Sequence, residues 1–293
     1  MKIIICIPAY NEEENIGKTI EEIKNSMNKT KYNYQILVLD DGSIDHTIKI
    51  AKKANVLVES NSHNIGLAET FKKEIKKALE LKADVIVHTD ADGQYNAKYI
   101  PGLINEIENG YDLVLGSRFI EKNKVMPFMN QFGNKSFAKV LSRLLKVKLT
   151  DTTTGFRAFT REVAENIQFI NTFTYTQEQI IKAAKQNFKI KEIPINARIT
   201  KRKSRLFKNP FEYAIKAWIN ILRIYRDYEP LKFFGRIGFT LIIIGIVIGL
   251  WLTYLFITKG KVGHIPLTIL TMLLIIAGIQ IIIFGFLADM RKL

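Results

Sequence analysis

The sequence is poor in the residues that build disulfide-linked and zinc-containing proteins. It has a single cysteine, Cys6, and only four histidines among 293 residues. One cysteine excludes an internal disulfide and a cysteine-rich zinc site, and the histidines are scattered from position 46 to position 264. Neither a disulfide-stabilised secreted domain nor a zinc enzyme is therefore expected. The apolar content of 47% also excludes a disordered chain.

Two common phosphate-binding loops are absent as well. No G-x-G-x-x-G follows the first predicted strand, and the chain has no G-x-x-x-x-G-K-[ST]. This argues against a dinucleotide-dependent dehydrogenase and against a Walker-type ATPase. No signal peptide is expected, because Met1-Lys2 is followed by only five apolar residues before Pro8.

The apolar residues concentrate in two long runs near the C-terminus. Residues 237–257 and 265–288 contain no charged side chain. As helices these runs would be roughly 31 and 36 Å long, enough to cross a hydrocarbon core of about 30 Å. The linker between them, residues 258–264, is short. The runs therefore predict a transmembrane helical hairpin with both flanks on the same side of the membrane.

The net charge of +15 is concentrated immediately before this hairpin. Residues 197–236 hold 11 lysines and arginines against 3 acidic residues, whereas the linker between the apolar runs holds only Lys259 and Lys261. Basic flanks favour the cytoplasmic side, and basic juxtamembrane residues attract anionic lipid headgroups. Residues 210–228 also have the apolar spacing of an interfacial helix. We expect an integral membrane protein that binds the lipid bilayer, has its N-terminal part in the cytoplasm and does not bind nucleic acid.

The N-terminal part alternates predicted strands and helices. Strands are expected at residues 3–7, 35–39, 56–58, 84–88 and 113–115, and helices at 12–27, 45–54, 67–81 and 98–108. This order predicts an α/β fold with a mostly parallel sheet covered by helices. Ligands of such sheets bind at the carboxyl ends of the strands.

Two acidic turns follow predicted strands at this edge. Asp90 and Asp92 stand two residues apart, so in an extended segment their side chains point the same way. Carboxylate oxygens suit Mg²⁺ or Mn²⁺ bound together with phosphate oxygens, and Gln94 can add a neutral oxygen. The second acidic turn begins with Asp40 and Asp41. Together the turns predict a nucleotide-diphosphate site, with one turn on the ribose or base and the other on the metal.

Arginines supply the opposite charge. Arg118 follows the predicted strand at 113–115, Arg157 follows Gly155-Phe156, and residues 201–205 form a basic cluster. Guanidinium groups match phosphate oxygens in bidentate fashion. In a chain with a membrane hairpin, these basic groups suggest a phosphate that is carried by a lipid.

Six motifs occur in order along this part of the chain. They are Pro8-Ala9-Tyr10-Asn11-Glu12, Asp40-Asp41-Gly42-Ser43-Ile44-Asp45-His46-Thr47, Asn64-Ile65-Gly66, Asp90-Ala91-Asp92-Gly93-Gln94, Gly116-Ser117-Arg118 and Asp151-Thr152-Thr153-Thr154-Gly155-Phe156-Arg157. With these motifs the sequence resembles glycosyltransferase family 2, and most of all the polyprenyl-phosphate sugar synthases of the dolichyl-phosphate mannose synthase type. The resemblance covers about residues 1–205, and the last motif favours the lipid-phosphate subgroup.

The resemblance implies the glycosyltransferase type-A fold and an inverting, metal-dependent transfer. The sugar would move from a nucleotide-sugar, GDP-mannose or a UDP-sugar, to dolichyl or undecaprenyl phosphate. The implied nucleotide-sugar contacts are Pro8, Tyr10, Glu12, Asp40, Asp41 and Asp90, and the implied ligands of Mg²⁺ or Mn²⁺ are Asp90, Asp92 and Gln94. The implied acceptor-phosphate contacts are Arg118, Asn134, Arg157, Ser204 and Arg205, and the implied catalytic residues are Asp92, Arg118, Arg157 and Glu178.

The implied organisation has three parts. A catalytic domain covers residues 1–205, an amphipathic juxtamembrane segment covers 206–236, and two transmembrane helices at about 237–257 and 265–288 lie within 237–293. An oligomer is compatible with this organisation. The chain departs from the family pattern at three places. Residues 202–205 do not read Gly-Glu-Ser-Lys, the helix after Gly66 lacks a second glycine, and residues 173–176 read Phe-Thr-Tyr-Thr rather than Gly-Tyr-x-Phe.

Two other functions fit the same residues. One is a family member with a hydroxyl acceptor on a glycolipid or glycan, which would need a base such as Glu178 or Asp151. The other is a non-catalytic membrane scaffold that kept the fold, which would have degenerate acidic turns, whereas both turns are intact. Processive polysaccharide synthases usually carry Gln-x-x-Arg-Trp and more spans, and neither occurs here.

Overall fold

The computed structural model describes residues 1–120, 128–167, 169, 175–198, 219, 222–223, 225–227, 229–261 and 265–290, with the backbone only at 128–133. Contacts divide the chain into two units, Met1–Pro210 and Phe211–Leu293. The predicted acceptor contacts Ser204 and Arg205 lie outside the described residues, as does most of the predicted amphipathic segment.

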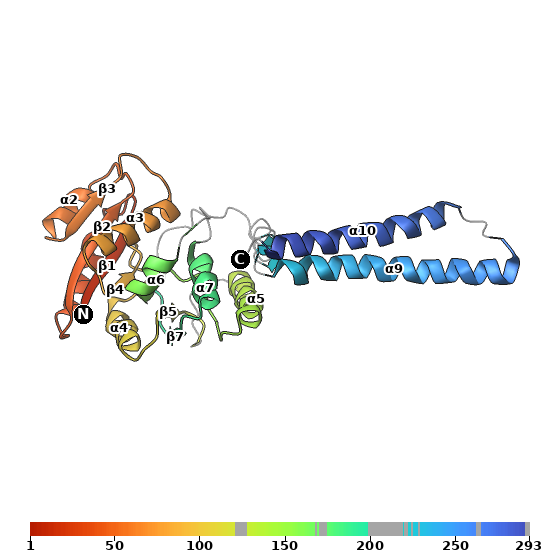
Figure 1. Ribbon diagram of the computed structural model, residues 1–293. Coiled ribbons are helices and arrows are strands. Elements are labelled where there is room, and N and C mark those ends of the chain that lie inside the picture. Colours follow the sequence, from red (N-terminus) through yellow and green to blue (C-terminus); the bar gives the residue numbers. More distant parts are fainter. Residues whose placement is uncertain are drawn as a thin grey trace. The chain divides into compact units, whose positions relative to one another are not determined.

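The N-terminal unit is built on a mixed sheet with helices packed against it (Figure 1). Within the described residues the sheet has seven strands in the order β3-β2-β1-β4-β6-β5-β7. The strands are β1 (Lys2–Ala9), β2 (Asn33–Asp40), β3 (Leu57–Ser60), β4 (Val85–His88), β5 (Leu113–Ser117), β6 (Arg157–Thr160) and β7 (Ile190–Pro194). β6 runs antiparallel to β4 and β5, and the other pairs are parallel. The predicted mostly parallel sheet is confirmed.

The helices of this unit follow the predicted alternation as far as α4. They are α1 (Ile16–Met27), α2 (Thr47–Lys53), α3 (Leu67–Glu80), η1 (Ala97–Tyr99), α4 (Ile100–Glu108), α5 (Phe128–Leu145), α6 (Arg161–Asn166) and α7 (Tyr175–Lys185). α1 buries Ile16, Ile20 and Ile23 on one face because they recur every three or four residues. These side chains pack on the apolar residues of β1 in the main core.

The antiparallel strand β6 determines what lies at the functional edge of the sheet. Because β6 runs opposite to its neighbours, it begins at the edge where β4 and β5 end. Arg157, its first residue, is the register partner of His88 on β4 and of Leu115 on β5. The turn at 151–156 therefore lies at the same edge as the two acidic turns.

The C-terminal unit contains two long apolar helices, α9 (Pro230–Lys259) and α10 (Ile265–Met290). Both are long and apolar enough to cross a membrane. α9 begins before the predicted span, at Pro230. Proline in the first turn of a helix costs no hydrogen bond, because the N–H group that it lacks would have no partner within the helix. The two helices touch backbone to backbone: a Cβ on Gly238 or Gly278 would lie 2.5 or 2.6 Å from the carbonyl oxygen of the other. Such close approach is typical of helix pairs in lipid.

Candidate active site at the carboxyl edge of the sheet

The turn after β2 is organised by its own first aspartate. Asp40 ends β2 and is fully buried. Its Oδ2 accepts hydrogen bonds from the backbone N–H groups of Gly42 and Ser43, both at 3.1 Å, and from the Ser60 hydroxyl at 2.8 Å. Its Oδ1 has no hydrogen-bond partner among the described residues. A buried polar atom without a partner is costly, so this oxygen suits a donor group on a bound ligand.

Asp41 ties the same turn to the loop before α3. Its Oδ1 accepts hydrogen bonds from the Asn61 amide and the Ile65 backbone N–H, both at 2.9 Å, and its Oδ2 accepts one from the Gly66 N–H at 3.0 Å. Most oxygens of the first acidic turn are thus used to shape loops of the protein.

The end of β1 lies beside this turn. Pro8 and Ala9 end the strand, and Ala9 is in register with Asp40. Tyr10 follows and is partly exposed, and the buried Glu12 donates its backbone N–H to the Thr47 hydroxyl at 2.8 Å. The fold therefore brings the residues predicted to contact the nucleoside to the ends of two neighbouring strands. Their contact with a nucleoside stays a prediction.

The aspartates of the second acidic turn accept fewer hydrogen bonds from the described residues than those of the first turn. Asp92 Oδ1 accepts one hydrogen bond, from the Gln94 backbone N–H at 2.9 Å. Within the described ranges, the Asp90 carboxylate accepts none, and His88 Nε2 lies 3.9 Å from its Oδ1. Gly155 packs against the same oxygen, where a Cβ would lie at 2.9 Å. The Asp90 side chain is 32% exposed, so one side remains open to a ligand.

The surroundings of Asp90 disfavour its negative charge. Burial raises the pKa of its carboxyl to about 6, and the charge of His88 opposes that rise in pKa. The pKa rises because the ionised form loses hydration in the protein. A bound cation acts in the opposite direction and stabilises the carboxylate.

The carboxylates of Asp90 and Asp92 fit a divalent cation that is shared with a diphosphate. They are hard oxygen donors of the kind that Mg²⁺ and Mn²⁺ prefer. In the part of the chain that the structure describes, no three His, Cys, Asp or Glu side chains form a group that could hold a metal. Phosphate oxygens and water would supply further ligands. The predicted role of the Gln94 side chain stays a prediction.

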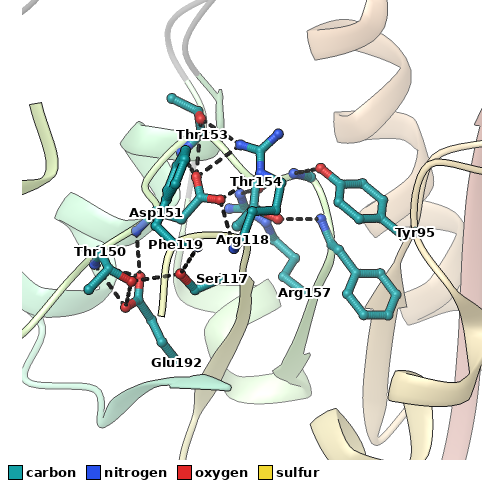
Figure 2. Close-up of polar contacts among 12 residues, drawn as sticks. Tyr95, Ser117, Arg118, Phe119, Thr150, Asp151, Thr153, Thr154, Arg157 and Glu192 are labelled. Carbon is teal, nitrogen blue, oxygen red and sulfur yellow. Dashed lines mark hydrogen bonds and ion pairs between the residues drawn. The ribbon is translucent and has the colours of Figure 1, made fainter. Parts of the chain in front are cut away.

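Arg118 follows β5 and is held by Asp151 from the turn before β6 (Figure 2). Its Nε donates to Asp151 Oδ2 at 2.6 Å and its Nη2 donates to Oδ1 at 3.0 Å, which is a bidentate pair. Nη2 also donates to the Thr153 hydroxyl at 2.8 Å. These bonds fix the guanidinium in place. Its Nη1 makes no hydrogen bond to a described residue.

Glu192 of β7 fixes Asp151 in turn (Figure 2). Its carboxylate accepts the backbone N–H groups of Thr150 and Asp151 and the Thr150 hydroxyl at 2.7–2.9 Å. Burial raises the pKa of Glu192, while these hydrogen bonds act to lower it. The position of Arg118 thus depends on a residue of β7, the strand that pairs with β5.

Arg157 is fully buried. Its Nη1 donates to the Thr176 carbonyl at 3.1 Å and to Gln179 Oε1 at 2.9 Å, and its Nη2 donates to the Thr154 carbonyl. Burial lowers the pKa of its guanidinium. In this structure Arg157 ties the turn before β6 to α7, and its predicted contact with an acceptor phosphate stays a prediction.

The remaining predicted residues lie on helices. Asn134 is buried in α5, and Glu178 is buried in α7, where it pairs with Lys182 at 2.8 Å. α7 is also the helix that supplies Thr176 and Gln179 to Arg157. The catalytic role of Glu178 and the acceptor role of Asn134 stay predictions.

The sequence analysis missed Glu192, which holds Asp151, and the buried Glu74–His88 pair beside the second acidic turn. Glu74 carried a usable signal: it is a charged residue on the buried face of α3, among Phe71, Ile75 and Ala78. His88 is likewise a polar residue at the end of an otherwise apolar buried strand.

Comparison of the sequence with known proteins identifies the family of this chain. The sequence profile of glycosyl transferase family 2 matches residues 4–168. A dolichyl-phosphate hexose transferase of Haloferax volcanii is 32% identical over 196 residues, which cover 66% of this chain and 81% of that protein. A dolichol-phosphate mannosyltransferase of Pyrococcus furiosus is 29% identical over 288 residues, which cover 93% of this chain and 78% of that protein. The chain belongs to glycosyl transferase family 2 and is a glycosyltransferase.

The comparison of folds gives the same class. The crystal structure of glucosyl-3-phosphoglycerate synthase from Mycobacterium tuberculosis, in complex with Mn²⁺, uridine diphosphate and glucosyl-3-phosphoglycerate, matches with a TM-score of 0.59. The match covers 75% of this chain and 79% of that one at 17% sequence identity. The predicted glycosyltransferase type-A fold is confirmed.

Proposed function

We propose that this enzyme transfers a sugar from a nucleotide-sugar to a polyprenyl phosphate, with Mg²⁺ or Mn²⁺ on the donor. One observation carries the proposal. The two weakly engaged carboxylates of Asp90 and Asp92 share the sheet edge with Arg118, whose charge acts on Asp90. Relatives named as a dolichyl-phosphate hexose transferase and a dolichol-phosphate mannosyltransferase support the same acceptor class.

The donor would lie across the ends of β1, β2 and β4. Pro8, Tyr10, Glu12 and Asp40 would contact the nucleoside, and the unpartnered Asp40 Oδ1 would accept a hydrogen bond from it. Asp90 and Asp92 would hold the cation against the diphosphate. A bound divalent cation stabilises the negative charge that develops on the leaving diphosphate. The Mn²⁺ and uridine diphosphate bound by the mycobacterial enzyme of the same fold support a cation here.

The acceptor phosphate would bind at Arg118. Asp151 and Thr153 hold two of the guanidinium nitrogens, and Nη1 is left to donate to a phosphate oxygen. An arginine fixed in this way loses little side-chain entropy when it binds the acceptor. Asn134, Arg157, Ser204 and Arg205 are proposed as further contributors on the acceptor side, and Glu178 near the sugar.

The acceptor needs no strong general base. A phosphate monoester has a second pKa near 6, so at pH 7 it is largely a dianion and already a nucleophile. The chain's residues then have to hold two mutually repelling phosphates in line, with positive charge on each. Attack from the face opposite the leaving diphosphate would invert the anomeric carbon.

The hairpin would anchor the enzyme in the bilayer where its acceptor lies. The 11 basic residues at 197–236, against two in the linker, support a catalytic domain that faces the cytoplasm. A lipid-linked acceptor and an anchored enzyme meet in two dimensions, so membrane attachment favours this substrate class.

A transfer assay tests the proposal. Membranes containing the full chain receive Mn²⁺ or Mg²⁺, a polyprenyl phosphate, and labelled GDP-mannose, UDP-glucose or UDP-N-acetylglucosamine in separate reactions. We expect label in the organic phase from one donor, dependent on both the cation and the lipid phosphate. The matched control is Glu69→Gln, which changes an exposed ion pair on α3 and should transfer normally. Absence of label from every donor, in a sample that binds a donor, would contradict the acceptor class.

A further inference from the structure

A glutamate and a histidine are buried together beneath the second acidic turn. Glu74 comes from α3 and His88 ends β4, and neither side chain has any exposed surface. His88 Nδ1 lies 2.7 Å from Glu74 Oε1. Apolar residues of similar volume would stabilise the same space at least as well as a buried ionic pair. Fold stability alone therefore does not account for these two residues.

The walls around the pair fix the imidazole ring in one orientation. The Phe71 ring meets it edge-on at a centroid distance of 4.9 Å, and the Tyr175 ring lies 6.0 Å away. Cys6 lies near the same Glu74 carboxylate, and burial together with that carboxylate raises the pKa of the Cys6 thiol. With Nδ1 engaged and two aromatic rings packed at a steep angle to it, the imidazole is held in place.

The second ring nitrogen faces the acidic turn. His88 Nε2 has no hydrogen-bond partner among the described residues and lies 3.9 Å from Asp90 Oδ1. Gly155 bounds the same oxygen, since a Cβ there would lie 2.9 Å from it. One oxygen of Asp90 thus lies against both His88 and Gly155.

We propose that Glu74 and His88 are positioning residues for Asp90, and this inference rests on the proposed metal role of that aspartate. The hydrogen bond between Glu74 and Nδ1 fixes the ring. The edge of the ring that carries Nε2 then orients Asp90 Oδ1, so that the remaining oxygen faces the cation. Loss of partners that orient a metal ligand typically weakens metal binding by about 10–100-fold. Neither residue touches a substrate, and no step of the transfer passes through them.

The test is a Mn²⁺ titration of the full chain in detergent, with unbound Mn²⁺ followed by electron paramagnetic resonance. The titration is run with Mn²⁺ alone and with UDP or GDP. We expect Glu74→Met, which removes the oxygen that holds Nδ1, and His88→Gln to weaken Mn²⁺ binding about tenfold or more, while nucleotide binding in EDTA stays at the wild-type level. Glu69→Gln, on the exposed side of the same helix, is the matched control and should bind Mn²⁺ normally.

Two results would overturn the inference, and they differ in meaning. Wild-type Mn²⁺ affinity in folded Glu74→Met, with only a changed melting temperature, would show a purely structural pair. Methionine is close to glutamate in volume, so this variant decides the matter even if His88→Gln fails to fold. If the wild-type chain binds no Mn²⁺ with either nucleotide, the proposed metal role itself fails along with the inference.

Discussion

The two acidic turns each place two aspartates ahead of a glycine, at or just after the end of a strand, but use their carboxylates in different ways. In the first, Asp40 and Asp41 accept hydrogen bonds from Gly42, Ser43, Ser60, Asn61, Ile65 and Gly66. In the second, the described residues give Asp92 one hydrogen bond and Asp90 none. The first turn shapes the protein, and the second leaves most of its oxygens without a hydrogen bond from the described residues.

The difference comes from the neighbouring strand in each case. β2 pairs with β3, and the loop after β3 brings backbone N–H groups and the Asn61 amide to the first turn. β4 pairs with the antiparallel β6, and the turn before β6 brings Gly155, whose N–H donates to the Tyr95 hydroxyl at 3.2 Å instead. Two aspartates after a strand therefore become a loop anchor or a ligand site according to what the adjacent strand presents.

The largest effect is expected from Asp92→Ala in the second turn. Removal of a cation ligand should cost about 4 kcal/mol of transition-state stabilisation, or roughly 1,000-fold in transfer rate. Because Asp92 accepts only one hydrogen bond, the melting temperature should stay near that of the wild type. Labelled-sugar transfer and thermal unfolding measure the two quantities, and transfer at the wild-type rate would refute the metal role.

The opposite pattern is expected for Asp41→Ala in the first turn. The substitution leaves the N–H groups of Asn61, Ile65 and Gly66 without their acceptor, at about 1–3 kcal/mol for a buried group that loses its partner. Thermal unfolding should show a clear loss of stability. The folded fraction should retain its Mn²⁺ affinity, and a tenfold loss of that affinity would erase the distinction between the turns.

Gly155→Ala tests the space beside Asp90. Its methyl group would lie 2.9 Å from Asp90 Oδ1, so the carboxylate or the backbone must move. Overpacking of this kind costs about 1–3 kcal/mol, and we expect about a tenfold loss of Mn²⁺ affinity in titration. The matched control is Gly102→Ala on α4, where a Cβ meets only Ile193 at an ordinary 3.5 Å. Equal Mn²⁺ affinity in the two variants would show that Asp90 is not confined by Gly155.

The smallest effect is a pH dependence of stability in the metal-free protein. The folded protein raises the pKa of Asp90 from 3.8 to about 6, so it binds that proton more tightly than the unfolded chain does. Ionised Asp90 therefore destabilises the fold above about pH 6, and the penalty disappears as the pH falls from about 6 to about 4. In EDTA, Asp90→Asn should melt a few degrees above the wild type at pH 7. The difference should close near pH 4, and a gap that is the same at both values would contradict the raised pKa.

Several features of the site and of the two apolar helices could be predicted because each depends on residues that are close together in the sequence. The acidic turns stand directly after apolar strands, and the apolar runs of the hairpin are long and free of charge. The binding edge followed from the parallel order of the strands. Residue spacing alone was enough for these features.

The rest depends on contacts between distant segments. The sequence analysis placed no strand at β6, so it could not show that Arg157 lies beside His88. It assigned Arg118 to a phosphate but did not foresee its bidentate pair with Asp151, or that Glu192 from β7 holds Asp151. The Glu74–His88 pair joins a helix to a strand 14 residues later, and only the fold reveals it.

The most direct test of the proposed reaction compares two lipids that differ only in the phosphate. The purified full chain is supplied with its preferred labelled nucleotide-sugar, a divalent cation, and either a polyprenyl phosphate or the corresponding polyprenol. We predict labelled lipid from the phosphate and none from the alcohol, because in the proposed reaction Arg118 binds an acceptor phosphate that is already a nucleophile. Equal or greater labelling of the polyprenol would contradict this account.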